Sequence, residues 1–230
     1  IYLRRAEVKM NMQRVNREKD PKEKVKAAAK AGTAMKEVMT ALKEGSFLRQ
    51  QAARDYVEIC FRVGGLFTDE ITRGGGSPEL QTAADGYFDE GIKTARPIQE
   101  KVDEWFFDQI GKYREATGAH QKALENKTNA AWMEKSKLQH ITEAALAQWP
   151  FLYERGTPKR KEIVGKGLEY IGDVIADYEE INPDDKLVYI SWIRLLGHDD
   201  DPMFDDEAKA RYAEVEKAQE KEEKERHDYY

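Results

Sequence analysis

The chain has 230 residues, of which 36% are charged and 40% apolar, and its mean hydropathy is −0.81. These values allow one large domain or two small ones with a heavily charged surface. The net charge of −6 argues against general nucleic-acid binding, which depends on basic side chains, and the single cysteine, Cys60, excludes an internal disulfide framework.

Charge is distributed unevenly along the chain. Residues 1–50 contain 13 basic and 6 acidic residues, whereas residues 198–230 contain 6 basic and 13 acidic ones. This asymmetry predicts that the two ends meet different surroundings or partners. No secretory leader is visible, and because the first residue is Ile1 rather than methionine, we expect a processed or truncated chain.

The first elements are predicted to be helices, because Ala, Glu, Lys, Gln, Leu and Arg dominate their sequences. Pro21 is typical of a first helical turn, and Gly45 ends the helix that it begins. Ser46 is a suitable N-cap for a second helix that runs to about Arg73 and stops at the break 74–78. The apolar face of the first helix is formed by Val25, Ala28, Ala31, Met35, Val38, Met39 and Leu42.

Beyond the break, further helices are expected at 79–91, 97–116, 119–148, 159–180, 186–196 and 205–227. The segment 187–196 is assigned as a buried helix rather than a strand, because no hairpin partner accompanies it. The acidic tail is expected to be a polar helix or a solvated arm.

We therefore predict an all-α, extended helical subunit. It divides into basic amphipathic helices at 1–45, a candidate membrane or partner helix at 46–76, a helical region at 77–197 and an acidic helical tail at 198–230. Residues 52–72 are the candidate transmembrane or membrane-embedded helix, because 21 residues at 1.5 Å each span about 31 Å, close to a hydrocarbon core.

That candidate helix has an ionic stripe and a glycine patch on an otherwise apolar surface. At 100° per residue, the charged side chains of this helix fall within a narrow stripe on one side. Glu58 and Arg62 stand four residues apart, in the order that favours an ion pair along a helix. Glycines allow a second helix to approach closely, and paired charges turned toward protein mark specific contacts. We predict a partner-helix contact at Asp55, Glu58, Arg62, Gly64, Gly65 and Asp69. The alternative is an ordinary amphipathic helix of a soluble bundle.

Residues 21–76 resemble subunit g of the mitochondrial ATP synthase. That family has a matrix-side amphipathic helix, a Gly-Ser-Phe junction and a membrane helix that carries a carboxylate. The segments "LKEGSF", "YVEICF" and "GGLFTDEITRGG" carry the likeness, although Asp69 stands where the family has a glycine. The matching positions are Gly45, Ser46 and Phe47 at the junction, Glu58 within the helix, and Gly64, Gly65, Glu70, Ile71 and Arg73 at its exit.

Motifs that carry chemistry are scarce. The sequence has no H-E-x-x-H, C-x-x-C, Walker A or G-x-S-x-G motif, and no histidine follows a glutamate by three residues as in di-iron bundles. The segment "GHDDDP" at 197–202 offers oxygen ligands for a cation but lacks EF-hand spacing. Cys60 has no histidine nearby in the sequence and is expected to be a buried thiol. We expect no catalytic residues, no cofactor and no metal.

Two functions follow from these patterns. The resemblance implies a non-catalytic accessory subunit of a large mitochondrial inner-membrane complex, the ATP synthase, where it would support ATP synthesis and proton transport by shaping the membrane sector or the dimer contact. Its partners would be other subunits and membrane lipid, with no nucleic acid. The alternative is a soluble, cytoplasmic helical-bundle interaction or scaffold protein. A helical enzyme with a carboxylate site is a third class.

Overall fold

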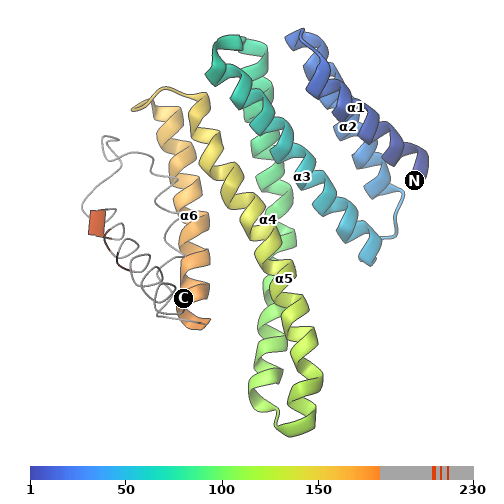
Figure 1. Cartoon of the computed structure of the whole chain (residues 1–230), viewed down its shortest axis with the longest axis vertical. Coiled ribbons are helices and arrows are strands. Elements are labelled where there is room, and N and C mark those ends of the chain that lie inside the picture. The colour runs from blue at the N-terminus through green and yellow to red at the C-terminus, as the bar shows by residue number, and fades with distance from the viewer. Residues whose placement is uncertain (182–208, 211–212, 214–216, 218–230) are drawn as a thin grey trace, which may run out of the picture. The chain divides into compact units, whose positions relative to one another are not determined.

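A computed structural model describes residues 1–181, 209–210, 213 and 217 (Figure 1). All regular elements in this part of the chain are helices, which confirms the all-α class. The expected helix at 186–196, most of the one at 205–227 and the segment 197–202 lie outside the described residues. The chain forms two compact units, which divide between Ala145 and Leu146.

The first unit is built from successive antiparallel helices (Figure 1). Helix α1 packs on α2, α2 packs on α3, and α3 makes its most extensive contact with α4. The elements are α1 (Tyr2–Arg17), α2 (Pro21–Thr40), α3 (Phe47–Glu70), the short π-helical turn η1 (Ile71–Gly75), α4 (Pro78–Glu115) and α5 (Gly118–Gln148).

Side-chain caps begin the helices where the sequence predicts. The Asp20 carboxylate accepts hydrogen bonds from the backbone N–H groups of Lys22 and Glu23 at the start of α2. The Ser46 hydroxyl accepts one from the Arg49 N–H at the start of α3, at 3.3 Å. Each cap satisfies N–H groups that have no acceptor within the helix. After α3, Gly74 adopts φ +89°, a left-handed conformation that glycine tolerates, and the chain turns there toward α4.

Helix α4 differs from the expectation of two helices at 79–91 and 97–116, which is wrong. It runs without interruption for 38 residues and contains Pro97. An internal proline removes one backbone hydrogen bond and costs about 3 kcal/mol in a helix. The long apolar face of α4 outweighs this cost, because Phe88, Ala95, Val102 and Phe106 are buried on both sides of the proline.

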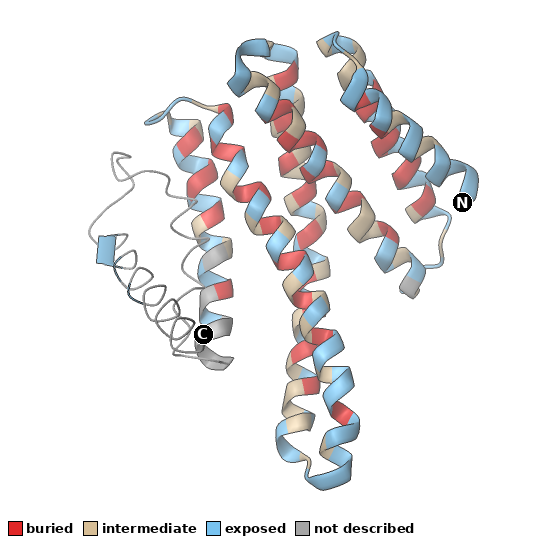
Figure 2. Cartoon of the chain, viewed as in Figure 1, coloured by how far each residue is buried: buried red, intermediate tan, exposed pale blue. Residues whose placement is uncertain are grey.

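The core lies between α2, α3 and α4 (Figure 2). Met35 and Val38 of α2 form a buried cluster with Ala52, Tyr56 and Cys60 of α3. Both α2 residues belong to the apolar face that the sequence predicts for this helix. Helices α3 and α4 approach closely at two glycines. A Cβ atom built on Gly64 would lie 2.9 Å from the Phe88 ring, and one on Gly91 would lie 2.4 Å from the Phe61 ring: Gly64 and Phe61 belong to α3, Phe88 and Gly91 to α4.

Among the described residues, no helix combines the length and the apolar character that crossing a membrane requires. This finding corrects the expectation of a transmembrane helix at 52–72. Six charged residues fall within that segment, and its apolar face is covered by α2 and α4 of the same chain.

The second unit begins with the last three residues of α5 and continues with the 3₁₀ turn η2 (Trp149–Leu152) and α6 (Pro158–Ile181). Trp149 is 1% exposed, and the Arg160 guanidinium donates hydrogen bonds to the carbonyls of Pro150, at 2.9 Å, and Tyr153, at 3.3 Å. Arg160 therefore ties the start of α6 to the turn. In the basic cluster at 157–162, Arg160 is thus a buried side chain.

Candidate interaction surfaces on α3 and α4

The ionic stripe of α3 is the side of the helix that the chain itself leaves open. Glu58 and Arg62 are exposed and Asp55 is half-buried, whereas Val57, Cys60 and Val63 are fully buried on the other side. A helix covered by its own chain on its apolar side and open along a line of charges has the amphipathic pattern of a surface helix, and its charged side is accessible to other molecules.

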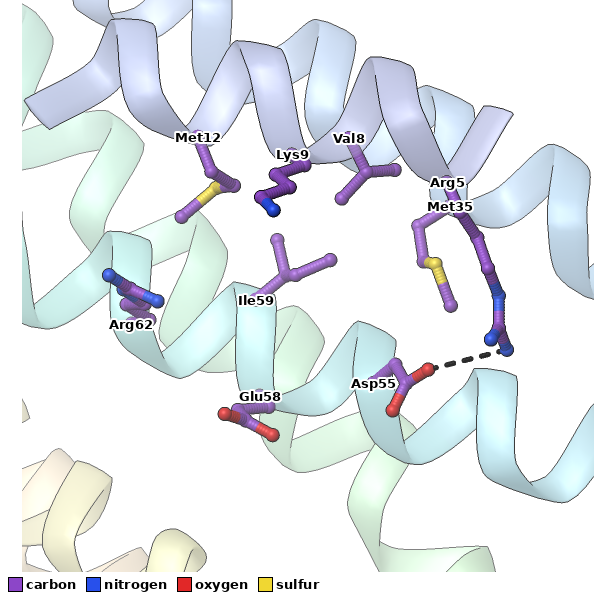
Figure 3. Close-up of a pocket in the computed structure, with 9 residues that line it drawn as sticks. All are labelled: Arg5, Val8, Lys9, Met12, Met35, Asp55, Glu58, Ile59 and Arg62. Atoms are coloured by element: carbon purple, nitrogen blue, oxygen red, sulfur yellow. Dashed lines mark ion pairs between the residues drawn. The ribbon is translucent and has the colours of Figure 1, made fainter. Parts of the chain in front are cut away.

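The stripe forms one wall of a pocket between α1 and α3, here called the α1–α3 pocket (Figure 3). Its volume is about 300 Å³. Arg5 of α1 pairs with Asp55 across it, at 3.5 Å. The pocket combines apolar and charged side chains, namely Arg5, Val8, Lys9, Met12, Met35, Asp55, Glu58, Ile59 and Arg62.

Glu58 and Arg62 do not pair with each other. Within the described part of the chain, neither side chain forms an ion pair or a side-chain hydrogen bond, although their spacing favours a mutual pair. Glu58 and Asp55 also line a second hollow of about 120 Å³, whose other wall is α5, with Lys137 and Leu138. The stripe thus runs between two hollows, one toward α1 and one toward α5.

The remaining predicted contact residues do not join this surface. Gly64 faces Phe88 of α4, so the close approach expected of a partner helix is made by the chain's own helix. Gly65 is buried, and Asp69 is exposed near the end of α3, where Arg73 lies 3.9 Å away. Glu70, which the resemblance matches to a membrane-exit signature, pairs with Lys24 of α2. The structure brings together Asp55, Glu58 and Arg62 and places the others elsewhere.

A larger hollow, which the sequence patterns do not predict, lies between α3, α4 and α5. This hollow, here called the Trp105 groove, has a volume of about 870 Å³. Helix α4 contributes Thr94, Pro97, Ile98, Lys101, Val102 and Trp105, which share one face at helical spacing. Trp105 is 40% exposed, and Met133 of α5, in the same groove, is 71% exposed.

Cys60 is fully buried between α2, α3 and α4. Burial raises the pKa of its thiol to about 12, and the Tyr56 phenol beside it acts in the opposite direction with a smaller effect. Tyr56 in turn donates to the Glu90 carboxylate at 3.2 Å, and Lys36 pairs with Glu90 at 2.7 Å. The thiol is neutral at physiological pH and lacks the exposed, electropositive surroundings of a reactive cysteine.

Because the thiolate is the reactive form, the folded protein should react with Ellman's reagent at about pH 8 more than a hundredfold more slowly, by order of magnitude, than the protein in about 8 M urea. Release of the coloured thiol measures both rates, and the chain's single cysteine makes the signal unambiguous. Equal rates in the two states would show that Cys60 is accessible and contradict the burial of this face of α3.

Within residues 1–181 and the four described positions beyond them, no group of three or more His, Cys, Asp or Glu side chains is arranged to hold a metal ion. Comparison of the chain with models of protein families, with curated proteins and with solved structures finds no match.

Proposed function

We propose that this chain is a non-catalytic interaction protein, a helical scaffold that holds a partner protein on the ionic stripe of α3. One observation carries the proposal. Glu58 and Arg62 stand open beside the α1–α3 pocket, while the apolar side of α3 packs in the chain's own core. In an interface, charged side chains without a partner in their own chain fix the register, and apolar side chains beside them supply contact area.

The composition of the pocket favours a protein as the bound molecule. Val8, Met12 and Ile59 provide apolar contact area, and the lining also contains carboxylates and cations. Carboxylates on the surface would repel a nucleic-acid backbone, whereas a protein helix can present complementary charges of both signs. A volume of about 300 Å³ suits a few inserted side chains rather than a large cofactor.

A narrower version of this proposal makes the partner a subunit of a mitochondrial inner-membrane complex, the ATP synthase. Its support is the likeness of residues 21–76 to subunit g and the basic character of residues 1–50, which suits a matrix-side location. Membrane contact and a role in shaping the membrane sector belong to this narrower version.

Affinity purification of the full chain from its native cells, with Arg62→Glu beside the unmodified sequence, tests the proposal. The charge reversal should abolish copurification of the partner and leave the far-UV circular dichroism unchanged, because Arg62 is exposed. Lys30→Glu is the matched control, since Lys30 is an exposed cation on α2 outside the pocket. ATP synthase subunits among the lost proteins would support the narrower version.

An unchanged set of partners with Arg62→Glu would contradict docking on the stripe. Loss of the same partners with both Arg62→Glu and Lys30→Glu would also contradict it, because binding would then follow net charge rather than this surface.

A further inference from the structure

The Trp105 groove has the dimensions of a helix-binding site. The α4 residues that line it, from Thr94 to Trp105, follow the spacing i, i+3, i+4, i+7, i+8 and i+11. Twelve helical residues extend about 17 Å, or three turns. The groove is therefore long enough for about three turns of a helix that lies along α4. A helix bound in a groove contacts its site through residues at this same i, i+3, i+4 and i+7 spacing.

The side chains in the groove are those that protein interfaces favour. Trp105 and Met133 are large apolar residues with 40% and 71% of their surface exposed, on two different helices. Ile98 and the largely buried Val102 also line the groove. Tryptophan and methionine are enriched in interfaces, and an apolar surface of this kind on a charged protein marks an interaction site.

The charges at the groove favour an acidic partner. Arg54 of α3 pairs with Glu134 of α5, so these two charges compensate each other. Lys101 is exposed on α4 and forms no ion pair within the described residues, and Arg49 stands on the α3 wall. Glu44 is the one remaining carboxylate of the lining, so the charges that are open to a partner are predominantly positive.

We propose that the Trp105 groove binds an amphipathic helix of a partner protein, with its apolar face on Trp105, Ile98 and Met133 and with acidic residues that pair with Lys101 and Arg49. This site is separate from the α1–α3 pocket and does not depend on the function proposed for the stripe. A chain with both sites would hold two partner segments on opposite sides of helix α3, as a scaffold does.

Two synthetic helical peptides of about 14 residues test the proposal on the full chain. Both carry one leucine stripe at i, i+3, i+4 and i+7 spacing; one has glutamates and the other lysines on its flanks. Isothermal titration calorimetry should give a dissociation constant at least about tenfold lower for the glutamate peptide. Lys101→Glu should reverse this preference, and Lys122→Glu, at an exposed position of α5 outside the groove, should preserve it.

Met133→Ala should weaken binding of the glutamate peptide by about tenfold or more, and because Met133 is exposed, the variant should keep the unmodified melting temperature. Equal affinity for both peptides, or binding that is indifferent to Lys101→Glu and Met133→Ala, would overturn the proposal. Saturable binding of dodecanoate with no binding of either peptide would overturn it in favour of a small amphiphile. Lys101→Glu and Met133→Ala should not affect the partners that depend on Arg62, so either proposal can fail without the other.

Discussion

Replacing Gly91 with alanine should lower the free energy of unfolding by about 2 kcal/mol. A Cβ atom at this position would lie 2.4 and 2.7 Å from two carbons of the Phe61 ring and 3.2 Å from the Cβ atom of Cys60, closer than van der Waals contact allows. The buried Phe61 ring, 7% exposed, has little room to move, and over-filling a packed core costs about 1–3 kcal/mol. Urea denaturation followed by circular dichroism measures the change.

Gly86→Ala is the matched control on the same helix. Gly86 is exposed, and a Cβ atom there would have nothing within 4 Å. Alanine is favoured over glycine in a helix interior by about 1 kcal/mol, so this variant should be more stable than the unmodified protein. If Gly91→Ala proves as stable as Gly86→Ala, helices α3 and α4 do not approach as closely as the structure describes.

Asp103→Ala should cost about 3 kcal/mol or more. The Asp103 carboxylate on α4 pairs at 2.6 Å with Lys135 of α5, whose side chain is only 1% exposed, and also accepts a hydrogen bond of 2.7 Å from Gln99. Removing the carboxylate takes a close counter-charge away from the ammonium group of Lys135 in the interior. Breaking a buried pair from one side typically costs about 3–5 kcal/mol. Thermal and urea unfolding measure the loss.

The complementary variant, Lys135→Met, should cost clearly less, about 1 kcal/mol or below. Methionine has a similar length and removes the buried charge, and Asp103 is 25% exposed and retains Gln99 as a donor. A result in which Lys135→Met is the more damaging of the two would show that the ammonium stabilises α5 through other contacts than its pair with Asp103.

The parts of the fold that follow from local sequence could be predicted. The apolar residues of α2 recur at helical spacing, and Ser46 and Pro78 stand at the starts of helices. These helices can therefore be predicted without knowing which other helices pack against them. The ionic stripe was likewise visible, because Asp55, Glu58 and Arg62 fall on one side of any helix drawn through them. The structure places these three side chains beside α1, with Glu58 and Arg62 exposed, and their role as a contact remains a prediction.

What could not be predicted depends on which helices meet. Gly64 and Gly65 indicate that another helix approaches closely, but they do not identify that helix. The group that approaches Gly64 is the ring of Phe88, 24 residues further along the same chain. Pro97 is a local breaking signal, and only the packing of α4 on both sides of it explains why the helix continues. The Trp105 groove requires three helices together, so no single stretch of sequence contains its signal.

Site-specific photo-crosslinking from Glu58 tests the central claim most directly. With p-benzoylphenylalanine in place of Glu58, the chain in its native cells should form a crosslink to one partner protein, because this position faces outward beside the α1–α3 pocket. The same group in place of Lys30 should not give that product. Crosslinks confined to the chain's own α1 or α5, or the same products from both positions, would contradict the claim that the α3 stripe is where this scaffold holds its partner.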